Sequence, residues 1–102
     1  MKRSSMQCKI PDDMRAQLAD DPFMERCAHE DIECEGRIEW HHAFTYAGKR
    51  VNELWSILPL CRYHHDKAAQ IANFLQIIMH ARMYQFDAID DFKEKYPKST
   101  LI

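Results

Sequence analysis

Apolar side chains recur at helical spacing over residues 64–83. Positions i, i+3, i+4, i+7 and i+8 share one face of a helix, and in this segment they are occupied by Ile71, Phe74, Leu75, Ile78 and Met79. We therefore predict a helix whose apolar face packs against the core. Ile77 widens that face, which leaves room for a homodimer contact.

Shorter elements are predicted along the rest of the chain. A helix is expected over 11–20, where a proline and two aspartates suit the first turn, and another over 86–96. Residues 37–41 alternate between polar and apolar types, and the apolar run 56–60 is short, so both segments predict strands. The segment 47–50 predicts a turn or loop. Together these elements indicate the α+β fold class.

Length and composition narrow the class of protein. The chain has 102 residues, which favours one domain over 1–102, and 46% of them are hydrophobic, which argues against a disordered chain. No apolar run approaches the roughly 18 residues of a membrane-spanning helix, and the basic start is not followed by the apolar stretch of a signal peptide. We expect a soluble cytoplasmic protein.

Cysteine and histidine are concentrated in one part of the sequence. Five of the six histidines and three of the four cysteines lie between positions 27 and 65. Two disulfides would suit a secreted protein, but nothing here indicates secretion. The density of thiol and imidazole groups therefore favours a metal site.

The segment Cys61-Arg62-Tyr63-His64 has two potential metal ligands with two residues between them, as in a zinc knuckle. We expect Cys27 and Cys34 to complete a closed, tetrahedral structural zinc site, although their six-residue separation is longer than usual. His29 and Cys8 are the alternatives to Cys27 at one corner.

The two His-His pairs predict a second, open site. Adjacent residues on a strand point to opposite sides, so His41 and His42 cannot do the same work. His65 lies about 100° further around a helix than His64, so it cannot easily share the same metal ion.

The chain resembles the HNH endonuclease family, which has a ββα-metal fold around a treble-clef zinc core. The resemblance rests on residues 34–42, CEGRIEWHH, and 58–67, LPLCRYHHDK, in which the His-His pair is separated by eighteen residues from Cys-x-x-His-His. It covers roughly 27–80 and leaves helical extensions over 8–26 and 81–102. In its small size the chain is similar to the free-standing nucleases of this family that phages and prophages carry.

The resemblance implies a role for each site residue. His42 takes the position of the general base, and His41 and His65 take those of ligands to a catalytic divalent ion. That ion is Mg²⁺ or Mn²⁺ by resemblance, whereas two imidazoles also suit Ni²⁺ or Zn²⁺. Ser56 stands where the family has an asparagine that orients the base, and Asn52 is the alternative source of that hydrogen bond.

The implied substrate is DNA, whose phosphodiester bonds would be nicked or cut in both strands. The net charge of −2 does not favour such a partner, but residues 36–67 carry five basic against three acidic side chains. We expect modest, salt-sensitive DNA binding there, through Arg37, Lys49, Arg50, Arg62 and Lys67. The alternative function is an inactive zinc-stabilised module that binds DNA or protein.

Overall fold

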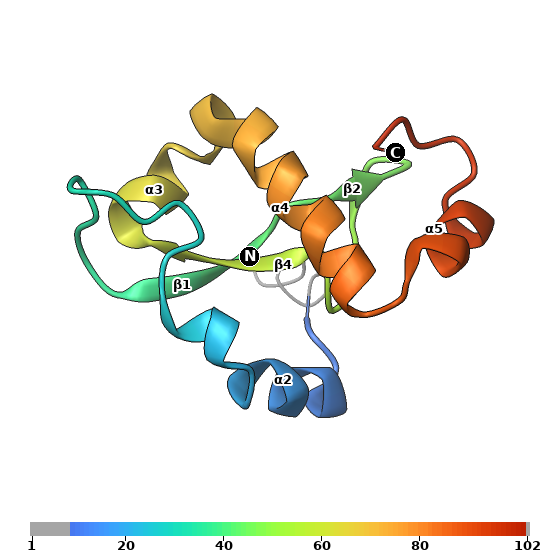
Figure 1. The fold of residues 1–102 in the computed structure, drawn as a ribbon, viewed down its shortest axis with the longest axis horizontal. Coiled ribbons are helices and arrows are strands. Elements are labelled where there is room, and N and C mark those ends of the chain that lie inside the picture. Colours follow the sequence, from blue (N-terminus) through green and yellow to red (C-terminus); the bar gives the residue numbers. More distant parts are fainter. Residues whose placement is uncertain (1–8, 102) are drawn as a thin grey trace.

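The computed structural model describes residues 9–101, and its centre is an antiparallel pair of strands (Figure 1). β1 (Ile38–His42) pairs with β4 (Ile57–Cys61), and both strands lie within one or two residues of their predicted positions. All five residues of β4 are buried. Pro59 is tolerated within β4 because this sheet has only two strands, so one side of each strand needs no ladder hydrogen bond.

The segment predicted as a loop forms a second, smaller sheet. β2 (Thr45–Tyr46) pairs antiparallel with β3 (Lys49–Arg50). Ala47 and Gly48 join them with φ angles of 54° and 79°, the left-handed conformations of a tight two-residue hairpin turn. The predicted turn is therefore confirmed at Ala47 and Gly48, but the prediction was wrong for Lys49 and Arg50, which form a strand. The sequence did not indicate either of the two flanking strands.

The long helix predicted over 64–83 is divided into three parts. α3 (Arg62–Asp66) follows β4 directly, η2 (Ala68–Ile71) is a 3₁₀ turn, and α4 (Ala72–Gln85) is the longest helix. The backbone leaves the helical conformation at Lys67, whose amide donates to the carbonyl of His64 three residues earlier. The apolar stripe therefore belongs mainly to α4.

Helices cover the β1–β4 pair on two sides (Figure 1). On one side, α2 (Asp12–Ala19) and η1 (Pro22–Glu25) contribute Leu18 and Met24 to a cluster with Ile57. On the other side, the buried face of α4 packs with α5 (Ile89–Lys95) around the core, which includes Leu58, Leu60, Trp55, Leu75, Met79, Met83 and Phe92. Alternate residues of β4 thus serve the two sides of the pair.

Two residues expected in the core stripe lie at the surface instead. Phe74 is 37% exposed and Ile77 is 65% exposed. The buried stripe is rotated around α4, to Leu75, Met79 and Met83, because these side chains face β4 and α5. None of the helices in the described part of the chain is long and apolar enough to cross a membrane.

Candidate metal centre

Three cysteines and one histidine converge beside the start of α3. The Nδ1 atom of His64 lies 3.5 Å from the sulfur of Cys27, 3.6 Å from that of Cys34 and 3.2 Å from that of Cys61. A tetrahedral zinc ion, at about 2.3 Å from sulfur and about 2.1 Å from nitrogen, would hold such ligands roughly 3.6 Å apart. The four side chains are therefore close enough to bind a metal ion, and the spacing is compatible with zinc.

The loop between Cys27 and Cys34 explains how six intervening residues fit. The Asp31 carboxylate accepts the amide of Glu33 at 2.8 Å, and the Asp31 carbonyl accepts the amide of Cys34 at 3.2 Å. These bonds fold the excess residues into a tight turn. The loop is also tied to β4, because the Ala28 amide donates to the carbonyl of Pro59 at 2.7 Å.

Gly36 lets the chain pass close to α3 after Cys34. Its φ of +88° favours glycine, and a Cβ there would lie 2.6 Å from the Cβ of Arg62. The approach is secured by the Tyr63 amide, which donates to the carbonyl of Glu35 at 3.1 Å. The Cys34 thiol is thereby brought over the first turn of α3.

Two of the three thiols have opposite pKa shifts. Burial and the neighbouring thiols raise the pKa of Cys27 to about 11. Burial also acts to raise the pKa of Cys61, but hydrogen bonds involving the backbone of His64 and Glu35 outweigh it and lower this pKa to about 6. Cys61 is thus the natural first thiolate of the cluster.

Asp31 contacts the side of the His64 ring that faces away from the three sulfurs. Its Oδ1 lies 3.4 Å from Nε2 of His64, the nitrogen that faces away from the sulfurs. Its Oδ2 lies 3.3 Å from Nδ1 of His29, whose ring packs 4.7 Å from the His64 ring. His29, considered above as an alternative ligand, therefore lies outside the sulfur cluster, in a second group with Asp31 and His64. The alternative ligand Cys8 lies outside the described residues.

Two of the other predicted site histidines, His41 and His65, meet on the other side of α3. His41 on β1 and His65 on α3 have ring centroids 5.1 Å apart. Burial, and then the nearby charges of His65, His42 and Arg50, lower the pKa of His41 to about 4, so its ring is neutral at pH 7. Glu39 accepts from Nδ1 of His65 at 2.7 Å, so Nε2 is the ring nitrogen that this bond leaves for a metal ion. In the described part of the chain, neither His41 nor His65 belongs to a cluster of three potential metal ligands.

His42 has a different partner. Its Nε2 lies 2.8 Å from Oδ1 of Asn52, and Nδ2 of Asn52 donates to the carbonyl of Lys9 at 2.9 Å. That second bond fixes the amide so that its oxygen faces His42, and an amide oxygen can only accept. Nε2 of His42 is therefore the donor, which leaves Nδ1 as the ring nitrogen that could accept a proton.

Ser56 is not at hydrogen-bond distance from His42. It is fully buried, and its hydroxyl donates to the carbonyl of Val51 at 2.8 Å and accepts the amide of Glu53 at 3.1 Å. Ser56 thus shapes the loop that carries Asn52, and of the two candidates Asn52 makes the side-chain contact.

The five predicted DNA-contacting side chains are distributed around the histidines. Arg37 lies 3.7 Å and Arg62 3.4 Å from the carboxylate of Glu39, and Lys67 lies over the ring of Tyr63. Arg62 also pairs with Asp66 at 3.5 Å. The other two, Lys49 and Arg50, are exposed on β3.

Sequence reasoning missed Asp31 and Glu39, which hold the histidines in place. Glu39 stands two residues before His41 and so shares its face of β1, a signal that was available in the sequence. Asp31 lies between the two cysteines, but nothing in its spacing indicated that its carboxylate turns toward a helix thirty residues away.

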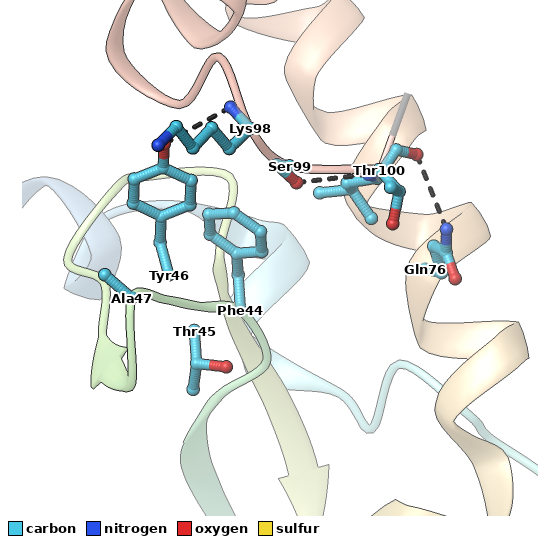
Figure 2. Close-up of a pocket in the computed structure, with 9 residues that line it drawn as sticks. Phe44, Thr45, Tyr46, Ala47, Gln76, Lys98, Ser99 and Thr100 are labelled. Carbon is cyan, nitrogen blue, oxygen red and sulfur yellow. Dashed lines mark hydrogen bonds between the residues drawn. The ribbon is translucent and has the colours of Figure 1, made fainter.

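A separate hollow of about 630 Å³ lies between the β2–β3 hairpin and the C-terminal segment (Figure 2). Phe44 and Tyr46 form one wall, and the Tyr46 hydroxyl accepts the amide of Lys98 at 3.2 Å. None of its described lining residues is a histidine, cysteine or carboxylate.

Comparisons of the chain with models of protein families, with curated proteins and with solved structures gave no match.

Proposed function

We propose that Cys27, Cys34, Cys61 and His64 hold a structural zinc ion. Three thiolates and one imidazole suit zinc, and the 3.2–3.6 Å separations between Nδ1 and the sulfurs support four-coordinate binding. With all four positions filled by protein ligands, such an ion stabilises the fold and has no open position for a substrate.

We further propose that the chain is a metal-dependent endonuclease of the HNH type that hydrolyses phosphodiester bonds of DNA. The observation that carries this proposal is the meeting of His41 and His65, 5.1 Å between ring centroids, with His42 next in the same strand. These are the three histidines to which the family resemblance assigns chemistry.

In this proposal each of the three histidines has a separate role in the hydrolysis of a phosphodiester bond. His41 and His65 would hold a divalent cation, whose charge, when it is bound, offsets the negative charge that develops on the phosphate. Nδ1 of His42 would take a proton from water as the water oxygen attacks phosphorus. The bond from phosphorus to the 3′-oxygen then breaks, and that oxygen takes a proton from solvent. By resemblance, the products carry a 5′-phosphate and a 3′-hydroxyl.

A specific observation favours a second candidate, a zinc-stabilised module that binds DNA or protein without cutting it. In the described residues, His41 and His65 bring no third cysteine, histidine or carboxylate close enough to complete a three-ligand cluster. A cation held by only two side chains would bind weakly until phosphate supplied further ligands.

Plasmid nicking separates the two candidates. Supercoiled DNA is incubated with the zinc-loaded protein and Mg²⁺, Mn²⁺ or Ni²⁺, and the relaxed and linear products are measured. We expect His42→Ala to lower the cleavage rate by about 10²–10⁴-fold while zinc content and thermal unfolding remain those of the wild type.

The matched control is His80→Gln, which removes an imidazole from α4 while keeping a donor for its partner, the carbonyl of Leu101. This variant should cut at the wild-type rate. Retention of full activity by His42→Ala would refute the assigned base. DNA binding without cleavage in every metal would favour the inactive module.

A further inference from the structure

The outer face of α4 carries an uninterrupted apolar stripe. Phe74, Ile77, Ala81 and Tyr84 are all exposed, with Ile77 at 65% and Tyr84 at 75%. They follow one another at intervals of three, four and three residues, the spacing of a helix-pairing seam. At 100° per residue they lie opposite the buried stripe that faces the core. This chain therefore leaves Ile77, Ala81 and Tyr84 open and covers Phe74 only in part, through the His29 ring at 4.7 Å.

The same face carries no charge. Residues 68–86 contain a single charged side chain, Arg82, and it is only 2% exposed because it turns inward to Asp21. A helix that faces water normally carries charged residues on its outer side. The exposed face of α4 therefore resembles an interface more than a solvated surface.

The stripe is complementary to itself under a two-fold axis. If the axis passes α4 at the level of Met79, residues equally far before and after Met79 face each other in an antiparallel helix pair. Ile77 then lies against the partner's Ala81, a large side chain against a small one. Phe74 lies against the partner's Tyr84, so that the two aromatic rings meet at each end of the seam.

A hollow next to Phe74 could receive the ring of the partner's Tyr84 at the end of that seam. It measures about 400 Å³ and is lined by Phe23, Arg26, His29 and Phe74 among others. Such a volume admits an aromatic ring. Phe23 and Phe74 offer apolar contact to the ring, while Arg26 and Glu30 at the rim offer polar groups to a phenol hydroxyl.

We propose that this face binds a second copy of the chain, as an antiparallel α4–α4′ homodimer. A partner with a charged surface would leave its charges unpaired against this face, whereas a second copy brings the same uncharged stripe. α4 has 14 residues and is therefore about 21 Å long, so the seam is smaller than a standard interface of about 800 Å² per partner. The dimer is accordingly expected to be weak, so that it forms only as the protein concentration rises.

The test is the molar mass of the zinc-loaded full chain in solution, measured by sedimentation over a wide range of concentration. The wild type should move from 12.2 kDa toward twice that mass as concentration rises. Ile77→Glu places two unpaired carboxylates in the seam and should raise the dimer dissociation constant by about 100-fold.

Ile32→Glu is the matched control, because Ile32 is 96% exposed in the loop that carries Cys34. It makes the same chemical change away from α4 and should dimerise as the wild type does. Both variants should keep wild-type zinc content and thermal unfolding, because both side chains face water.

A mixing experiment tests the antiparallel register. Ile77→Lys and Ala81→Glu should each be monomeric alone. Mixed together, they should form a heterodimer in which the introduced lysine of one chain faces the introduced glutamate of the other. A parallel pairing would give no such rescue. A wild type that stays at 12.2 kDa throughout, or an Ile77→Glu variant that dimerises normally, would overturn the proposal.

Discussion

Asp31 offers the sharpest test of how the candidate zinc site is built. Its carboxylate has two functions, since Oδ1 both accepts the Glu33 amide at 2.8 Å and faces Nε2 of His64 at 3.4 Å. Asp31→Asn keeps an oxygen for the turn but removes the negative charge behind the histidine. Asp31→Ala removes both contributions. The pair of variants therefore separates the support of His64 from the folding of the loop.

The expected magnitudes follow from these contacts. Loss of a partner behind a metal-bound histidine typically weakens metal binding about 10–100-fold. The 3.4 Å contact is long and the Asp31 side chain is 34% exposed, so we expect the lower end, about tenfold, for Asp31→Asn. Asp31→Ala also loses the hydrogen bond of the turn, worth about 1 kcal/mol, and should weaken zinc binding roughly 50-fold in total.

Zinc affinity is measured by competition with a chromophoric chelator at fixed pH. Glu33→Gln is the matched control, because it removes the same charge from the same turn through an exposed side chain that no described contact ties to His64. It should bind zinc as the wild type does. A wild-type zinc affinity of Asp31→Ala would refute the proposal that Asp31 supports His64. If Glu33→Gln weakened zinc binding as much as Asp31→Asn does, the effect would be one of overall charge and not of the contact with His64.

Two further predictions concern stability. Chelation of the proposed zinc should abolish cooperative thermal unfolding, and Zn²⁺ but not Mg²⁺ should restore it, because three thiolates prefer the softer ion; cooperative unfolding that survives chelation would contradict this. Arg82→Met should lower the free energy of unfolding in urea by about 3 kcal/mol, because it leaves the mostly buried Asp21 carboxylate without its partner. Burial alone would raise the pKa of Asp21, but hydrogen bonds from Arg82 and the Phe23 amide and the Arg82 charge lower it. The stabilisation is therefore present above about pH 4 and lost as the pH falls through the lowered pKa, so the difference between the two proteins should shrink at acid pH.

The two central strands and the close approach of Cys61 and His64 were predicted well because each has a short-range signal. The alternation before His41 and the apolar run before Cys61 located β1 and β4 within one or two residues. The Cys61-x-x-His64 spacing is set by one turn of α3, where the Cys61 sulfur accepts the amide of His64. Local geometry of this kind can be predicted because it depends on residues that are close together in the sequence.

The rotation of α4 could not be predicted in the same way. Phe74 and Leu75 are adjacent and both strongly apolar, so periodicity alone gives no reason to bury one and expose the other. The choice depends on Arg82, which a sequence pattern places in water. In the structure its guanidinium lies over the rings of Phe23 and Phe86, at 4.1 and 4.8 Å, and pairs with Asp21. The inward arginine thus lies on the same buried face of α4 as Leu75, Met79 and Met83.

The position of His65 depends on its neighbour in the sequence, His64. α3 has only five residues, too few for a helix to be stable on its own, so its conformation must come from contacts around it. Cys61 caps its first turn and the His64 ring faces the three sulfurs, which together fix the rotation of the helix. His65, about 100° further round, is then directed toward His41 and Glu39. The proposed zinc would thus position His65 beside His41 without touching a substrate. Variants that remove one of the three cysteines should therefore lose both the fold and any catalytic activity of these histidines.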